Sequence, residues 1–72
     1  MSFNMSYFAE VLRIERARRG WSQDELAKRS KMSRSMVIKY ENEECVPTFE
    51  SACKLADALN IRTDDFWKPH AA

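Results

Sequence analysis

Apolar residues recur along the chain at the spacing of amphipathic helices. Over residues 7–19 the apolar stripe consists of Phe8, Val11 and Leu12, at the i, i+3, i+4 spacing that places side chains on one side of a helix. Ser6 is a suitable N-cap for this helix. Gly20 marks its end, because glycine readily takes the left-handed conformation found just past helix C-termini.

The next two predicted helices are short and closely spaced. Ser22 and Glu25 have the spacing of a capping box ahead of a helix over residues 23–30. After a break at residues 30–32, Ser33 is the expected N-cap of a helix over residues 34–41.

The rest of the chain predicts two more helices. Thr48 opens a helix that runs to about residue 59, and its inward stripe comprises Phe49, Ala52, Leu55, Ala56 and Leu59. Asn60 tolerates the left-handed conformation that ends such a helix. Thr63 then caps a last short helix, which contains Asp64, Asp65, Phe66 and Trp67.

Composition supports one small all-α domain. The chain has 72 residues, of which 44% are hydrophobic, enough for a single compact core. One glycine and two prolines are too few for the tight turns of an all-β fold. No apolar run approaches the roughly 20 residues of a membrane span. We expect a compact five-helix domain over residues 1–72, with its core at about 6–67, in a soluble cytoplasmic protein without membrane contact.

The sequence contains few candidate catalytic, metal-binding or cofactor-binding residues. Cys45 and Cys53 lack the CxxC spacing of a metal or redox pair, and the only histidine, His70, follows Pro69 near the end of the chain. A catalytic histidine must be held on a rigid element, and zinc needs a set of Cys and His ligands. Gly20 alone cannot form a phosphate-binding loop. The sequence therefore predicts two reduced thiols and neither an enzyme, a metal site nor a bound cofactor.

Charge is divided unevenly between the two halves of the chain. Residues 1–39 carry nine Lys or Arg against four Asp or Glu, and residues 40–72 carry three against seven, for a net charge of +1. A basic half can lie on phosphates while the acidic half turns away. Surface helices are also commonly charged without any binding partner, so the charge distribution alone does not establish that the protein binds nucleic acid.

Residues 23–41 have the layout of a helix-turn-helix, two short helices joined by about three residues. At 100° per residue, one side of the second helix carries Met36, Val37 and Tyr40. The opposite side, over residues 34–42, is polar except for one apolar residue and consists of Arg34, Ser35, Ile38, Lys39 and Asn42.

This outer side suits the major groove of B-DNA, which admits one α-helix and exposes the base edges. Arg34 can fork onto a guanine, and Lys39 can reach a guanine or a phosphate. Ser35 can bond as donor or acceptor, and Ile38 can touch a thymine methyl. The candidate phosphate contacts at the start of the preceding helix are Ser22 and Gln23. The alternative is an ordinary helical hairpin with a solvated outer side.

Five segments carry a family resemblance: GWSQDELA at residues 20–27, MSRSMVIKYEN at 32–42, PT at 47–48, LADALNI at 55–61 and DDF at 64–66. In these segments, in their order and spacing, the chain resembles the Xre family of helix-turn-helix repressors, which includes lambda-type phage repressors and Cro proteins. The resemblance runs from about residue 8 to residue 67. It implies a five-helix, lambda-repressor-like DNA-binding domain that acts as a homodimer on a near-palindromic operator.

The resemblance also implies roles for individual positions. The residue matching Gln23 binds a phosphate and supports the second helix of the motif, and the one matching Asn42 touches the DNA backbone. The pair matching Arg16 and Glu41 forms a salt bridge between the first and third helices. The usual base contacts match Ser33, Arg34, Ser35 and Lys39.

The chain departs from the family pattern at two glycines. Lys31 replaces the glycine of the turn, so a cation lies beside the 34–41 helix, where it can contact the DNA backbone. If Lys31 keeps a positive φ, it carries roughly 1 kcal/mol of strain. Glu43 replaces the glycine common after the third helix, and with Glu44 it puts two negative charges where the DNA backbone is expected to run.

Three functions are consistent with the sequence. The first is a transcriptional regulator, in the form of a repressor, whose expected dimer interface comprises Ile61, Phe66 and Trp67. The second is an antitoxin, or a controller of a restriction–modification operon, with the same fold; either a toxin or an effector is then a possible protein partner. The third is a protein-interaction module that does not bind DNA.

Overall fold

The computed structural model describes residues 3–67 and is helical throughout its regular elements. The elements are α1 (Met5–Arg18), α2 (Gln23–Ser30), α3 (Arg34–Glu41), α4 (Phe49–Leu59) and the 3-10 helix η1 (Thr63–Phe66). This confirms the all-α prediction, with the fifth predicted helix present as a single 3-10 turn. His70 lies outside the described residues. None of the helices in the described part combines the length and apolar character needed to cross a membrane.

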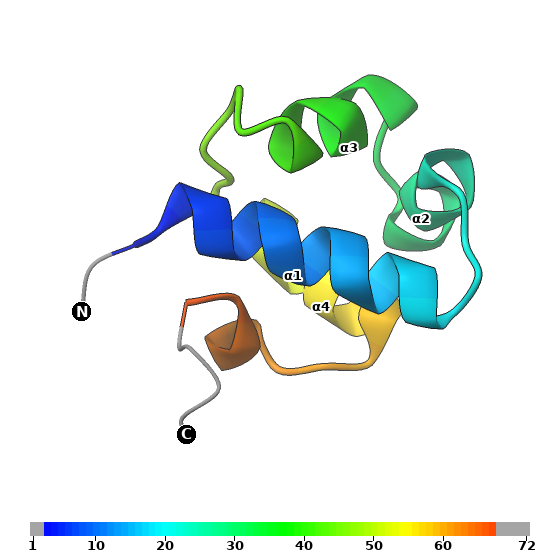
Figure 1. Ribbon diagram of the computed structural model, residues 1–72. Helices are drawn as coiled ribbons and strands as arrows, with labels where there is room; N and C mark the ends of the chain where they lie inside the picture. The colour runs from blue at the N-terminus through cyan, green and yellow to red at the C-terminus, as the bar shows by residue number, and fades with distance from the viewer. Residues whose placement is uncertain (1–2, 68–72) are drawn as a thin grey trace.

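The helices pack around α1 (Figure 1). In this view α2 and α3 lie together above α1, η1 lies below it, and α4 passes behind it. The helix α3 packs against both α1 and α2, and α4 packs against α2 and η1. The outer side of α3 is therefore left uncovered by the described elements.

Phe8 lies at the centre of the core and joins three elements. Its ring is fully buried, meets Tyr40 of α3 edge-on at a centroid distance of 5.8 Å, and lies 4.8 Å from the ring of Phe66 in η1. Aromatic pairs in this range contribute about 0.5–1.5 kcal/mol beyond the burial of their area. The other large, fully buried side chains are Leu12, Leu26, Val37, Leu55 and Leu59.

All four α-helices end in one hydrogen-bonding pattern. After α1, the Gly20 N–H bonds to the Ala17 carbonyl and the Trp21 N–H reaches back to the Arg16 carbonyl, as in a Schellman motif. The same pair of bonds closes α2, α3 and α4. The residues in the left-handed conformation, with φ of 68°, 59°, 63° and 56°, are Gly20, Lys31, Glu43 and Asn60. Only the first is a glycine, so Lys31 and Glu43 hold the left-handed conformation at the two positions where the family resemblance implies glycine.

Most helix starts agree with the predicted caps. The side chains of Ser22, Ser33 and Thr48 each accept the backbone N–H three residues further on. The Ser6 cap is wrong, because Asn4 caps α1 through Tyr7 N–H at 3.0 Å and the helix begins earlier than predicted.

The predicted cap at Thr63 is also wrong, because Thr63 is the first residue of η1 and follows the N-cap Arg62. The Arg62 N–H is held by the Asp65 carboxylate at 3.1 Å.

Phe49 does not belong to the inward stripe of α4. Its side chain is 70% exposed, whereas Ala52, Leu55, Ala56 and Leu59 are buried. Phe49 is the first residue of α4 and points roughly 70° away from the centre of the buried stripe. The periodicity therefore predicted the stripe correctly but extended it one turn too far.

Replacing Lys31 by glycine is expected to stabilise the protein. Lys31 has a φ of 59°, and Lys31→Gly removes a left-handed strain of about 1–2 kcal/mol at the cost of added backbone freedom, for a net gain of about 0.5–1 kcal/mol. The free energy of unfolding in urea measures the change. Asn60→Gly is the control and should gain less, since Asn tolerates this conformation. Equal or lower stability of Lys31→Gly would show that Lys31 is unstrained.

Candidate nucleic-acid interface

The helix α3 has a buried inner side and an exposed outer side, as its sequence predicts. Val37 and Tyr40 are buried in the core, and Met36 is half-buried against it. The outer residues Ser33, Arg34, Ser35, Lys39 and Asn42 are exposed. Ile38 is half-buried rather than exposed, so it presents only part of its side chain to a ligand. Four of the five predicted base-contacting residues are therefore exposed, Ser33 at the N-cap and Arg34, Ser35 and Lys39 within α3.

A cleft joins the start of α2 to the start of α3. It has a volume of about 610 Å³ and is lined by Arg16, Ser22, Gln23, Asp24 and Arg34. The structure thus brings Ser22 and Gln23, the predicted phosphate contacts, next to Arg34. Of the two guanidinium groups in the lining, that of Arg16 is paired with Glu41, so Arg34 is the cation that this pair leaves for a ligand. The N-terminal end of α2, with Ser22 and Gln23, supplies donors that suit a phosphate.

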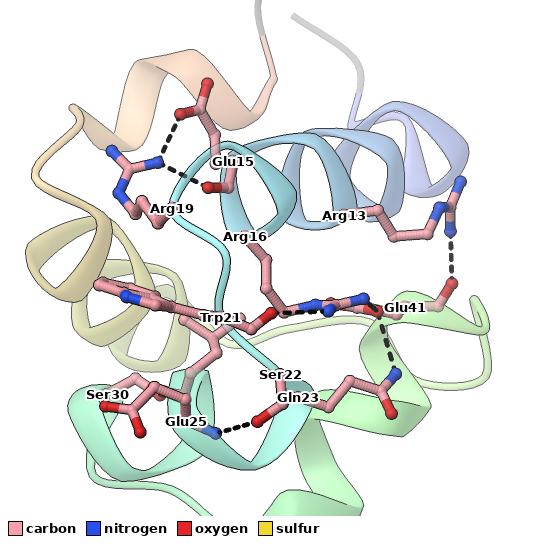
Figure 2. Close-up of polar contacts among 11 residues, drawn as sticks. Arg13, Glu15, Arg16, Arg19, Trp21, Ser22, Gln23, Glu25, Ser30 and Glu41 are labelled. Carbon is pink, nitrogen blue, oxygen red and sulfur yellow. Dashed lines mark hydrogen bonds and ion pairs between the residues drawn. The ribbon is translucent and has the colours of Figure 1, made fainter.

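Below this cleft, Arg16 and Glu41 form the predicted ion pair between α1 and α3. Arg16 Nε lies 2.8 Å from Glu41 Oε2 and its Nη2 lies 3.0 Å from Oε1. A third bond runs from Arg16 Nη1 to the Trp21 carbonyl at 2.9 Å (Figure 2). The side chains are 21% and 3% exposed, respectively. A two-pronged pair this far from water fixes the end of α3 on α1.

Gln23 contacts the same carboxylate. Its Nε2 donates to Glu41 Oε1 at 3.0 Å (Figure 2), so the first residue of α2 is tied to the last residue of α3. A glutamine amide carries two N–H donors, and one of them is used here. The supporting role implied for Gln23 is thus present, and the second donor stays available for a phosphate.

Two further contacts between α1 and the end of α3 escaped the sequence analysis. Arg13 Nη1 donates to the backbone carbonyl of Glu41 at 2.7 Å, and Ser6 Oγ donates to Glu43 Oε1 at 2.9 Å. The signal was present in part, because Arg13 lies one helical turn before Arg16. Two of the three arginines of α1, Arg13 and Arg16, therefore act on the same residue of α3.

Trp21 anchors the connection between α1 and α2. Its ring lies 4.4 Å from the guanidinium carbon of Arg29 and 5.7 Å from that of Arg19, within cation–π range. Arg19 also donates to the Glu15 carboxylate at 2.8 Å and to the Leu59 carbonyl (Figure 2 shows the former). These contacts hold the start of α2 relative to α1 and α4.

Lys31 does not join the other predicted backbone contacts. It is exposed and lines a separate cleft of about 390 Å³, between α2 and α4, whose other residues are Arg29, Ser30, Lys54, Asp57 and Ala58. The cleft beside Arg34 does not include it. Lys31 therefore lies apart from Ser22 and Gln23.

The predicted dimer interface is wrong in one residue. Phe66 is fully buried against Phe8 in the core of the monomer, so its ring cannot contact a second copy. Ile61 and Trp67 are half-buried and pack partly on the same core.

Sequence and structure comparisons agree on the family. The HTH_3 helix-turn-helix family model matches residues 12–66. The chain belongs to this family. The match contains the whole of α2, α3 and α4, together with the Arg16–Glu41 pair. The Xre-like resemblance is thereby confirmed.

Solved structures include helix-turn-helix proteins similar to this chain. The restriction-modification controller protein C.AhdI from Aeromonas hydrophila is 32% identical, with 88% of this chain and 96% of that chain covered at a TM-score of 0.83. The hypothetical transcription factor NHTF from Neisseria is 27% identical, with 92% and 76% covered at 0.87. An HTH_3 family transcriptional regulator from Vibrio cholerae is 31% identical, with 86% and 35% covered at 0.81. No curated protein matches the chain.

Removing Arg16 and removing Glu41 are expected to lower the free energy of unfolding of this helix-turn-helix protein by different amounts. Arg16→Met leaves the Glu41 carboxylate, 3% exposed, without its cation, and should cost about 2–4 kcal/mol of unfolding free energy. Glu41→Gln should cost less, about 1–2 kcal/mol, because Arg16 keeps its bond to Trp21 and reaches water. Urea unfolding measures both.

Arg18→Met is the matched control for this pair. Arg18 is 70% exposed and meets Glu15 only at 3.5 Å, so its loss should stay within about 0.5 kcal/mol. Equal losses in Arg16→Met and Arg18→Met would contradict a stabilising role for the Glu41 pair.

Proposed function

We propose that the protein is a cytoplasmic, sequence-specific DNA-binding regulator of transcription, acting as a repressor. It inserts α3 into the major groove as a homodimer on a near-palindromic operator. The observation that carries this proposal is the exposed outer side of α3, which lies beside the cleft that Ser22, Gln23 and Arg34 line at the start of α2. One surface thus offers groups for base edges and groups for phosphates.

Each exposed residue of α3 has a chemical role in this proposal. Arg34 forks onto the O6 and N7 atoms of a guanine, and Lys39 reaches a second guanine or a phosphate. Ser33 and Ser35 bond base edges through their hydroxyls, and the accessible part of Ile38 meets a thymine methyl. Backbone phosphates beside α3 are held by Ser22, Gln23 and Asn42, and Lys31, which lines a separate cleft, is assigned a different phosphate.

The small size of one domain supports a homodimer. A single small module buries only about 600–1,000 Å² on DNA, and a second copy doubles the contacts available for tight, specific binding. The domain measures 30 × 23 × 19 Å, which allows two copies to lie side by side with their α3 helices about 34 Å apart in successive major grooves. Ile61 and Trp67 supply the contact between copies.

Selection of bound duplexes from a random pool tests the proposal. The expected product is a near-palindrome with half-sites about 10 base pairs apart. Binding to the selected duplex should weaken with salt, with a slope of log K against log salt near −0.9 for each phosphate contacted. A slope near zero would favour the protein-interaction module instead.

Arg34→Ala should weaken binding to the selected duplex by about 1–3 kcal/mol and relax the base preference at one position of each half-site. The reason is the loss of a two-pronged contact to one base. Competition binding with single-base variants of the duplex measures this. Arg18→Ala, which removes an exposed cation away from α3, is the control. An equal loss on every sequence would make Arg34 a phosphate contact.

Glu43→Gln should raise the affinity for duplexes of any sequence about two- to five-fold at low salt, because one of two carboxylates after α3 is removed. The substitution keeps an acceptor for the Ser6 hydroxyl, which bonds Glu43 at 2.9 Å. Glu43→Gly should act in the same direction while also relieving strain. Glu50→Gln, in a side chain 81% exposed, serves as the control. Unchanged binding would show that this loop lies far from the DNA backbone.

A controller of a restriction–modification operon is the second candidate function. It is favoured by the similarity to C.AhdI, since the match covers 96% of that chain. Such a protein also binds DNA, so the two candidates differ in the target. Locating the selected sequence in the source genome distinguishes them. A site beside the gene for this protein and a restriction–modification operon favours the controller, and a site elsewhere favours the general regulator.

A further inference from the structure

The carbonyl groups at the C-terminal end of α3 are all accounted for, and one partner comes from another helix. The last four carbonyls of a helix have no partner within it. In α3, three of them accept backbone N–H groups, at 2.9, 2.8 and 3.2 Å: Ile38 from Asn42, Lys39 from Glu44, and Tyr40 from Glu43. The fourth, of Glu41, accepts from Arg13 Nη1 at 2.7 Å. Arg13 therefore completes the hydrogen bonding of this helix end.

The charge of Arg13 also suits its place. The C-terminal end of a helix carries a partial negative charge, and a cation there is stabilising. The only basic residue in the last turn of α3 is Lys39, whose side chain lies on the outer side. Arg13 supplies a cation from α1 instead, so Lys39 stays available for a ligand.

Arg13 and Arg16 restrain different parts of Glu41. Arg16 holds the carboxylate, which is joined to the backbone through rotatable side-chain bonds. Arg13 holds the carbonyl oxygen itself (Figure 2), and this oxygen moves only if the helix end moves. Val37 and Tyr40 hold the middle of α3 in the core, so the bond from Arg13 to the backbone acts on the position of the last turn.

We propose that Arg13 is a positioning residue that sets the angle of α3 for base contacts and is not itself a phosphate ligand. The inference rests on the proposed DNA-binding function. Arg13 acts through Glu41, and its loss lets the end of α3 move without unfolding the domain. Specific binding, which needs α3 at one angle, then suffers more than general binding to phosphates.

The test compares Arg13→Gln, Arg13→Lys and the matched control Arg18→Gln. Arg18 lies on the same helix, 70% exposed, and its substitution removes the same charge without touching α3. Affinities for the selected duplex and for a random-sequence duplex are measured over a range of salt. Circular dichroism confirms that each variant is folded.

Arg13→Gln should bind the selected duplex about tenfold more weakly, and its affinity for the random duplex should fall no more than that of Arg18→Gln. The salt slope on the random duplex should match that of Arg18→Gln. Arg13→Lys should recover most of the specific affinity, because one ammonium donor suffices for one carbonyl. Equal losses on both duplexes, with a slope smaller by about 0.9 than that of Arg18→Gln, would make Arg13 a phosphate ligand and overturn the proposal.

Amide hydrogen exchange gives a readout that does not depend on DNA. In Arg13→Gln, the amides of residues 42–44 should exchange faster than in Arg18→Gln, while those of the core stay unchanged. Unchanged exchange at these amides overturns the positioning role. A wild-type protein that enriches no duplex from the random pool overturns the proposed function, and the exchange measurement still decides whether Arg13 holds the end of α3.

Discussion

The structure depends on the buried carboxylate of Glu41. Two N–H groups of Arg16 and one of Gln23 converge on its oxygens, so the last residue of α3 is joined to α1 and to the first residue of α2. A carboxylate 3% exposed is costly to bury unless it is fully bonded. The same bonds that satisfy it also fix the three helices that form the candidate nucleic-acid interface. Stability and the geometry of the interface are therefore coupled through one side chain.

Features encoded by neighbouring residues were predictable from the sequence. The caps Ser22, Ser33 and Thr48 and the left-handed residue Asn60 follow from side chains that act on the backbone within a few positions. The two sides of α3 follow from helical periodicity. These local rules located the helix-turn-helix and its outer residues, whose contacts with DNA stay predictions.

Features that depend on distant residues were not predictable in the same way. Periodicity gives the direction of a side chain about its helix but not the element that covers it. Phe49 was therefore placed inside although it is exposed, and Phe66 outside although it packs against Phe8. The bond from Arg13 to Glu41 spans 28 positions, and no local pattern specifies such a partner. Asn4 and Ser6 are both competent caps, and only the fold decides between them.

The residues that attach α3 to the rest of the domain are almost entirely different from those on its exposed side. Glu41, Val37 and Tyr40 hold the helix, whereas Arg34, Ser35 and Lys39 face outward and take no part in its attachment. Mutations at these outward positions can accumulate without weakening the fold, so the scaffold tolerates a change of target at little cost in stability. Ile38, which is partly covered, is the exception, and its replacement affects both the target and the packing. Related proteins with this domain can thus differ in the target that α3 recognises while they keep the same contacts between helices.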